Sequence, residues 1–183
     1  WMATDAGVAR FDGQHFESFT AEDGLTNNDV LNMQEDSQGR LWFLTLAGGF
    51  CYYKDGKIHN AKTDAWLRQG PKTSFQASLF EDSQHNLWFI SRHEGVFCLR
   101  EDTTLRFDVP GKDYRFGVGG LWEDENQNIL VRTLESVWQL SPTLKQLQNG
   151  LEPFSHIAAG FPMDHGILTC DYEGNLWKSK ADQ

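Results

Sequence analysis

Alternating oxygen-bearing side chains in the stretch DENQN are the first chemical signal in this sequence. Asp124, Asn126 and Asn128 follow one another at every second position, like the first ligands of a calcium-binding loop. Such a loop then needs a glycine for its sharp turn, and this chain has Ile129 instead. We therefore predict a hydrogen-bonded turn at this place, with no metal site and no cofactor.

Histidine and cysteine chemistry finds equally little support. The six histidines show neither HxH nor HExxH spacing. Cys51, Cys98 and Cys170 are an odd number without a CxxC pair, which favours buried free thiols over zinc or a disulfide framework. No nucleophile elbow and no phosphate-binding glycine loop is present. We predict no catalytic residue and expect that this chain is not an enzyme.

The net charge of −10, with a pI near 4.9, excludes two classes of partner. An acidic surface repels phosphate backbones and anionic lipids, so we expect no nucleic-acid binding. No apolar run approaches the ~18 residues of a membrane-spanning helix. Contact with a membrane is therefore expected only through a larger parent protein.

An internal repeat dominates the chain. The stretch EDSQGRLWFLT (35–45) returns at 81–91, at 123–133 and, in weaker form, at 170–179. In each copy an aspartate stands six residues before a tryptophan or its replacement, and the period is about 40–45 residues. The residues that we assign to this structural repeat are Asp36, Gly39, Trp42, Asp82, Trp88, Asp124, Asp171, Gly174 and Trp177.

Each repeat contains four short segments rich in aromatic and β-branched residues, bounded by Gly, Asp, Asn or Ser. Such segments are strands, and four short antiparallel strands per repeat are typical of a β-propeller blade. We predict an all-β chain of about four blades, and only 141–151 shows any helical spacing. The units run over 1–41, 42–87, 88–129 and 130–176, and another begins at 177–183.

The repeated residues have expected roles in folding. Asp36 can accept hydrogen bonds from backbone amides two residues on and so close an Asx turn. Gly39 can supply the positive φ of a short hairpin loop, a conformation that His85 and Gln127 would adopt with strain. The tryptophans at 42, 88 and 177 are expected to form aromatic wedges between neighbouring blades.

The stretch FTAEDGLTNNDVLNMQEDSQGRLWFLT (19–45) resembles the repeat of the two-component-regulator propellers. This resemblance implies the extracytoplasmic, periplasmic sensor region of a bacterial inner-membrane histidine kinase, of the hybrid type found in Bacteroidetes. Propellers of that family close with about seven blades. The resemblance therefore implies that the chain is a segment of a larger propeller, with the remainder of the sensor chain as its partner.

Loops before the first strand and after the second strand of a blade share one face, opposite the Asp turns. Ligands of propellers meet such loops, which tolerate variation better than strands. A polar ligand such as a saccharide could bind there, with Trp66 as a stacking surface; alternatively these residues are simply solvated. The candidates are Asn27, Asn28, Asp29, Trp66, Arg68, Arg92, His93 and Glu135.

Three functions are compatible with such a propeller. The first is a non-catalytic, ligand-sensing module that signals to a kinase elsewhere in the parent chain. The second is a scaffold for protein–protein interaction without a small-molecule ligand. The third, a lyase or hydrolase, would need carboxylates and a His or Tyr at the channel, whereas the carboxylates here fall mainly in the Asp turns.

An open arc of blades would also expose apolar flanks, such as Trp42 or Phe43 at one end and Leu176 or Trp177 at the other, and would favour a homo-oligomer.

Overall fold

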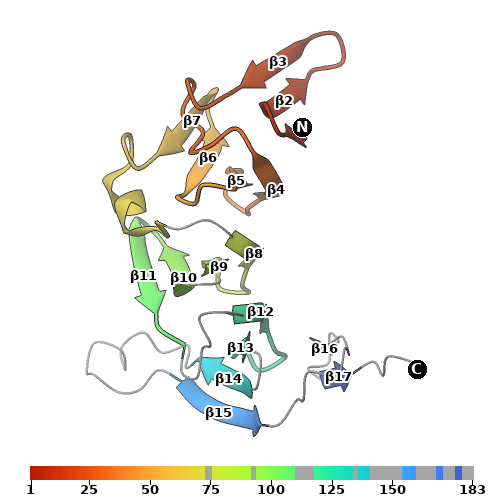
Figure 1. Ribbon diagram of the computed structural model, residues 1–183, viewed down its shortest axis with the longest axis vertical. Helices are drawn as coiled ribbons and strands as arrows, with labels where there is room; N and C mark the ends of the chain where they lie inside the picture. Colours follow the sequence, from red (N-terminus) through yellow and green to blue (C-terminus); the bar gives the residue numbers. More distant parts are fainter. Residues whose placement is uncertain are drawn as a thin grey trace.

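The computed structural model describes residues 1–72, 76–91, 94–109, 118–133 and 136–140, and the strands at 154–159, 168–170 and 176–178. Within these residues the chain is β-structure apart from one short 3-10 helix, η1 (Ala65–Gln69). The strands form successive antiparallel sheets that follow one another in chain order (Figure 1). The predicted all-β architecture is confirmed.

We name the four larger sheets blades 1 to 4. Blade 1 has three strands, β1 (Met2–Thr4), β2 (Gly7–Phe11) and β3 (Phe16–Phe19). Blade 2 contains β4 (Val30–Glu35), β5 (Leu41–Thr45), β6 (Cys51–Lys54) and β7 (Lys57–Asn60). Blade 3 contains β8 (Gln76–Glu81), β9 (Leu87–Ser91), β10 (Gly95–Arg100) and β11 (Thr103–Phe107). Blade 4 contains β12 (Val118–Glu123), β13 (Ile129–Thr133), β14 (Ser136–Leu140) and β15 (Phe154–Ala159), and a pair follows, β16 (Leu168–Cys170) with β17 (Leu176–Lys178).

Every four-stranded blade has its strands in sequence order, so that each strand pairs with the next one along the chain. The Asp turn joins the first strand to the second: in blade 2, Glu35 pairs with Leu41 beside the turn and Val30 pairs with Thr45 at the other end. The first strands, β4, β8 and β12, lie on one side of the arc and β7 and β11 lie on the other (Figure 1). Each four-stranded sheet begins with the strand before the Asp turn, whereas the units counted from the sequence begin at the tryptophan position after that turn. Each sheet thus begins one strand earlier than the corresponding unit.

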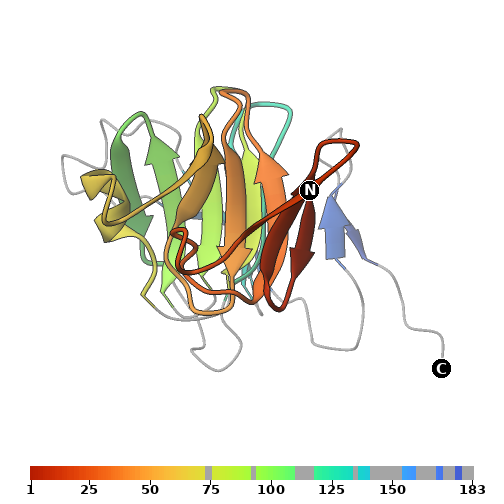
Figure 2. The ribbon, with the colours of Figure 1, turned by 90° about the horizontal axis from the view of Figure 1, so that it is seen from above.

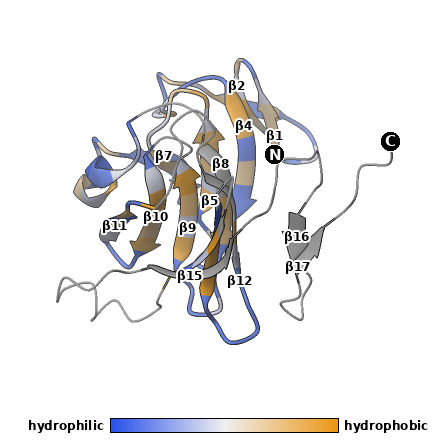
Figure 3. Cartoon of the chain, turned by 60° about the horizontal axis from the view of Figure 1, so that its bottom comes forward, coloured by the Kyte–Doolittle hydropathy of each residue, from blue (hydrophilic) through white to orange (hydrophobic). Residues whose placement is uncertain are grey.

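The hydrophobic core lies between the blades, which stack face to face (Figure 2). Strand β5 shows why its sequence, LWFLT, is continuously apolar: Trp42 packs with Phe89 of blade 3, whereas Phe43 packs with Val8 and Phe19 of blade 1. A strand that is covered on both faces needs no polar alternation, and Figure 3 shows β5 and β9 as hydrophobic bands. The expectation that Trp42 or Phe43 lies on an open flank is wrong, since their exposed fractions are 0% and 1%.

A register shift recurs at the same place in the first strand of each four-stranded blade. It falls between Val30 and Asn32 in β4, and at the equivalent positions in β8 and β12. Such a β-bulge adds one residue to a strand and redirects its side chain. In β4 the extra residue is Leu31, whose exposed fraction is 53%.

The glycines that open β2 and β10 are required by close packing. A Cβ atom on Gly7 would lie 2.2 Å from the carbonyl oxygen of Phe19, and one on Gly95 would lie 2.4 Å from that of Phe107. Both glycines also have positive φ, 118° and 111°. Only glycine allows β3 to approach β2, and β11 to approach β10, so closely at this point.

In the part of the chain that the structure describes, no helix is both long and apolar enough to span a membrane.

Candidate functional site

The Asp36 carboxylate organises the turn between the first two strands of blade 2. Its Oδ1 accepts the backbone N–H groups of Gln38 and Arg40, each at 2.9 Å, and the turn is the predicted Asx turn. Its Oδ2 accepts the Arg40 guanidinium Nε at 2.6 Å and the Trp42 indole Nε1 at 2.7 Å. Both oxygens are thus used within the turn.

The same turn recurs in blades 3 and 4. Asp82 Oδ1 accepts the backbone N–H groups two and four residues on at 2.9 and 2.8 Å, and Oδ2 accepts Asn86 Nδ2 at 2.9 Å. Asp124 repeats this arrangement, with the side chain of Asn128 donating to Oδ2 at 3.0 Å. The DENQN stretch is therefore one more Asx turn. Positive φ angles occur at Gly39 (70°), His85 (64°) and Gln127 (64°), as the sequence predicts.

The six-residue spacing between Asp and Trp is explained by a buried hydrogen bond that the sequence reasoning missed. The indole Nε1 of Trp88 donates to Asp82 Oδ2 at 2.6 Å, as that of Trp42 does to Asp36. The wedge role is also present: Trp42 contacts Phe89 of the next blade with ring centroids 5.6 Å apart. Leu130 stands at the position of the tryptophan in blade 4, where it is buried, with an exposed fraction of 5%, and offers no donor.

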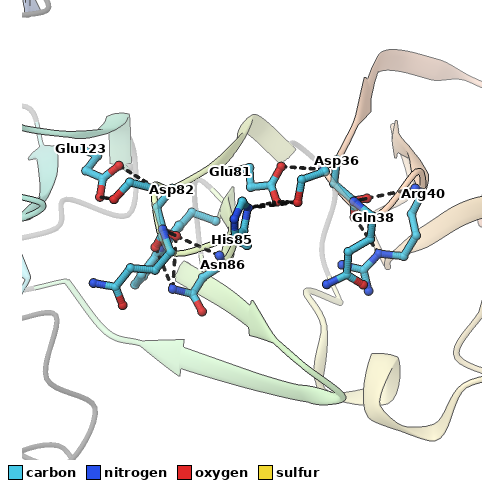
Figure 4. A network of polar contacts seen from close by, with 12 residues as sticks. Asp36, Gln38, Arg40, Glu81, Asp82, His85, Asn86 and Glu123 are labelled. Carbon is cyan, nitrogen blue, oxygen red and sulfur yellow. Dashed lines mark hydrogen bonds and ion pairs between the residues drawn. The ribbon is translucent and has the colours of Figure 1, made fainter.

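Neighbouring blades are joined on the turn face by a Glu–Ser contact, also missed from the sequence. The Glu81 carboxylate of blade 3 accepts the backbone N–H of Ser37 of blade 2 at 2.8 Å and the hydroxyl of the same serine (Figure 4). Glu123 binds Ser83 in the same way, at 2.8 and 2.7 Å. His85 adds a 3.0 Å contact between its Nδ1 and the Ser37 hydroxyl. The recurring sequence Glu-Asp-Ser could have indicated these contacts. Its Asp closes the turn within one blade, while its Glu and Ser form hydrogen bonds to neighbouring blades.

Hydrogen bonding also governs the ionisation of Asp36. Burial works to raise its pKa, but the hydrogen bonds from Trp42 and from the backbone and side chain of Arg40, together with the Arg40 charge, outweigh burial and hold the pKa below the ordinary value of 3.8. The folded state therefore binds this proton less readily than the unfolded state does.

We expect this carboxylate to make folding sensitive to acid. A depressed folded-state pKa contributes stability that is present above about pH 4 and is lost as the pH falls through the folded-state value. The free energy of unfolding of the parent protein should thus fall more steeply below about pH 4 than that of Asp36→Asn. Urea titrations of both proteins at matched pH values test this, and parallel curves would contradict it.

The loop before β4 holds the first group of predicted ligand-binding residues. Asn28 Oδ1 accepts the backbone N–H of Ala21 at 2.7 Å, and Asn27 Oδ1 accepts that of Asp29 at 2.8 Å. The Asp29 carbonyl in turn accepts the backbone N–H of Leu46 at 2.9 Å. These contacts place the loop beside the end of β5, on the face opposite the Asp turns, as predicted. Asn28 remains exposed at the surface.

Trp66 and Arg68 lie on η1, a helix that the sequence did not predict. Trp66 is half-buried against Trp42 and Tyr52, with centroids 6.3 and 6.4 Å away, and its carbonyl accepts the Thr104 hydroxyl of blade 3 at 2.8 Å. It therefore joins blades 2 and 3 at their outer strands. Arg68 is exposed, and its Nε donates to the Ala61 carbonyl at 3.0 Å. Within the described residues, no hydrogen bond, ion pair or ring contact links η1 to the Asn27–Asp29 loop.

A His–Asp–Tyr group lies next to η1. His59 Nδ1 is 2.8 Å from Asp64 Oδ2, and the Tyr52 ring stacks on His59 with centroids 4.8 Å apart. Burial, followed by the Asp64 charge, raises the pKa of Tyr52 to about 12, so this phenol stays protonated and acts as a donor. The group is built on the third and fourth strands, away from the first strands.

The remaining candidates are only partly described. Arg92, His93, Glu135, Asp171 and Gly174 lie outside the described residues, and Trp177 lies within β17. Glu94, next to the Arg92–His93 pair, accepts the backbone N–H of Lys72 at 2.7 Å. Cys51 and Cys98 are buried free thiols, as predicted, and burial raises the pKa of each.

Consecutive four-stranded antiparallel sheets that stack face to face are the architecture of the β-propeller class. Residues 24–47 match the model of the two component regulator propeller, so the chain contains the repeat that its sequence resembles. Comparison with curated proteins gives no match.

Solved structures with the same fold include members of two groups of proteins. One contains extracellular domains described as parts of hybrid two component systems of B. thetaiotaomicron: BT3049 (21% identity, TM-score 0.62) and BT4673 (18%, 0.66). These matches cover 98% and 97% of this chain, which spans only 24% of the length of each of those domains. The other contains virginiamycin B lyase of Staphylococcus aureus (13%, 0.67), with 97% of this chain and 57% of the lyase covered. At such identities these structures establish the shared fold.

Proposed function

We propose that this chain is a ligand-sensing propeller module of an extracytoplasmic sensor region, non-catalytic itself, that signals to a kinase elsewhere in its parent protein. The observation that carries the proposal is the two component regulator propeller repeat at residues 24–47. The likeness to sensor ectodomains of B. thetaiotaomicron supports it. On this proposal the chain is one part of a larger propeller in the periplasm.

The two faces of the blades suggest where a ligand would bind. On the turn face, the Asp36 and Asp82 carboxylates and the Glu81 and Glu123 carboxylates are engaged by other parts of the chain. The opposite face carries the loops that lead into the first strands, including the exposed residues Asn28 and Lys72. We therefore place a polar ligand, such as a saccharide, on the loop face.

Calorimetric titration with a panel of neutral and acidic oligosaccharides tests this proposal. We expect saturable binding by at least one of them, weakened about tenfold or more by Asn28→Ala or Arg68→Ala, since a polar ligand contact contributes about 1.4 kcal/mol or more. Gln38→Ala, which changes an exposed side chain on the turn face, is the matched control and should bind as the parent does.

Two results would contradict the proposal. If Gln38→Ala weakens binding as much as Asn28→Ala does, the ligand does not bind on the loop face. If none of the oligosaccharides binds, the proposal that the ligand is a saccharide is wrong. Mass spectrometry of the recovered ligand adds a second readout, because conversion of the sugar would contradict a non-catalytic module.

A further inference from the structure

Blade 4 carries a charged side chain at a position where blades 2 and 3 carry apolar ones. Strand β13 pairs with β12 in the register of the other blades, and Arg132 lies opposite Gly120. Leu44 of blade 2 and Ile90 of blade 3 hold the same position as Arg132. Their exposed fractions are 2% and 0%, and each packs against the blade that follows its own. Arg132 thus places a positive charge on a blade face that is apolar elsewhere.

Arg132 lies on the face of blade 4 that is turned away from blade 3. Its neighbour Val131 packs with Trp88 of blade 3, and successive side chains of a strand point to opposite faces of the sheet. Trp122 lies opposite Leu130 and therefore shares the face of Arg132. Leu130 is buried there, whereas Arg132 and Trp122 are half-buried. The charged residue and the tryptophan thus lie at the margin of a covered face.

The indole of Trp122 needs a hydrogen-bond acceptor. Its Nε1 is buried, and no described residue accepts its hydrogen, whereas the indoles of Trp42 and Trp88 donate to aspartates. Buried donors in proteins are almost always paired, so this one requires an explanation. Gly120 adjoins both side chains, because a Cβ atom on it would lie 3.4 Å from Arg132 Nε and 3.6 Å from a ring carbon of Trp122. A donor and a cation therefore meet beside a residue without a side chain.

An acidic ligand has the groups that this arrangement binds. A guanidinium holds a carboxylate through charge-assisted hydrogen bonds, which are stronger beside protein than in open water. We propose that Arg132 and Trp122 form a binding site for a small organic acid, whose carboxylate contacts the guanidinium and whose second oxygen-bearing group accepts the indole hydrogen. Gly120 leaves room for this ligand next to both. The site shares no residue with the loop-face candidates Asn28 and Arg68.

Nuclear magnetic resonance of the isotopically labelled 183-residue chain gives a direct readout of the site. The chain has seven tryptophans, and Trp122→Phe identifies the indole signal of Trp122. Titration with succinate should shift this signal saturably, because an oxygen of the ligand accepts the indole hydrogen. Succinamide has a similar shape without the charge and should bind at least about tenfold more weakly.

Protein variants separate binding from folding. Arg132→Leu installs the residue of blade 2, so it should abolish the succinate shift without lowering the denaturation midpoint. Gly120→Asp places a carboxylate beside the guanidinium, where a Cβ fits without a clash, and should also abolish binding. Gly120→Ala adds only the Cβ and should keep the affinity within about threefold. Arg100→Gln is the matched control, since it removes the same charge from an exposed position of blade 3 and should bind as the parent does.

Three results would overturn the proposal: no saturable shift of the Trp122 signal at millimolar succinate, equal binding of succinate and succinamide, or binding that Arg132→Leu retains. A lowered denaturation midpoint of Arg132→Leu, together with no succinate binding by the parent, would show that a carboxylate of the chain itself holds this arginine. Asn28→Ala should leave succinate binding unchanged, so this site and the proposed saccharide site succeed or fail independently.

Discussion

Replacing Trp88 with alanine should lower the free energy of unfolding by about 3–5 kcal/mol, as the loss of a large buried aromatic side chain does. Trp88 has an exposed fraction of 4% and packs in the core shared by blades 3 and 4, with Val131 and Leu140. The truncation would open a cavity between the blades and would also remove the donor to Asp82. Denaturant unfolding followed by far-UV circular dichroism measures the change.

Two variants test the cause of this destabilisation. Trp88→Phe keeps most of the packing and loses the indole donor, so it should cost about 1–3 kcal/mol. Gln84→Ala removes an exposed side chain from the same turn and should change stability by no more than about 0.5 kcal/mol. Unfolding of Trp88→Ala at the same denaturant concentration as the parent protein would refute the wedge role.

The second large effect is expected for Asp82→Asn, which should destabilise the protein by about 2–4 kcal/mol. The buried Asp82 carboxylate accepts hydrogen bonds from two backbone amides, from Asn86 and from Trp88. An asparagine can still accept from the amides through one oxygen. Its NH₂ group would then face donors, which leaves the indole N–H unpaired in the interior.

Asp124→Asn is the matched control for this substitution. Asp124 closes the same kind of turn, but Leu130 stands where the indole donor would be, so its replacement should cost only about 1 kcal/mol. The double variant Asp82→Asn/Trp88→Phe should be less destabilised than the sum of its single changes, by about 1–2 kcal/mol, because both remove one shared hydrogen bond. Additive effects, or equal losses for the two aspartates, would contradict the assigned role of the indole.

Local features were readable from the sequence because they depend on neighbours along the chain. The Asx turn at Asp36 and the positive φ at Gly39 and His85 involve residues at most four positions apart. The strand pattern LWFLT and its return predicted the sheets for the same reason. In contrast, η1 escaped prediction because five residues with one buried side chain, Leu67, carry no helical periodicity.

The placement of candidate ligand residues was less accessible. Trp66 looked like a stacking surface in the sequence, and the structure instead packs it against Trp42 and holds its carbonyl with Thr104. The local sequence is the same whether such a tryptophan is half-buried at the edge of a blade or exposed to a ligand. What distinguishes them is a contact with a strand nearly forty residues further along the chain.

By itself, the sequence determined the repeat, the Asp turns, the four-stranded sheets and the acidic surface, since each follows from composition or from short spacings. Tertiary structure decided how the repeats engage one another. Glu81 meets Ser37 across 44 positions, and Trp42 fills the space against Phe89 only because consecutive sheets stack face to face. Stacking also decided that Trp42 is fully buried, with an exposed fraction of 0%, because burial depends on which strands and blades surround a residue and not on the residue itself.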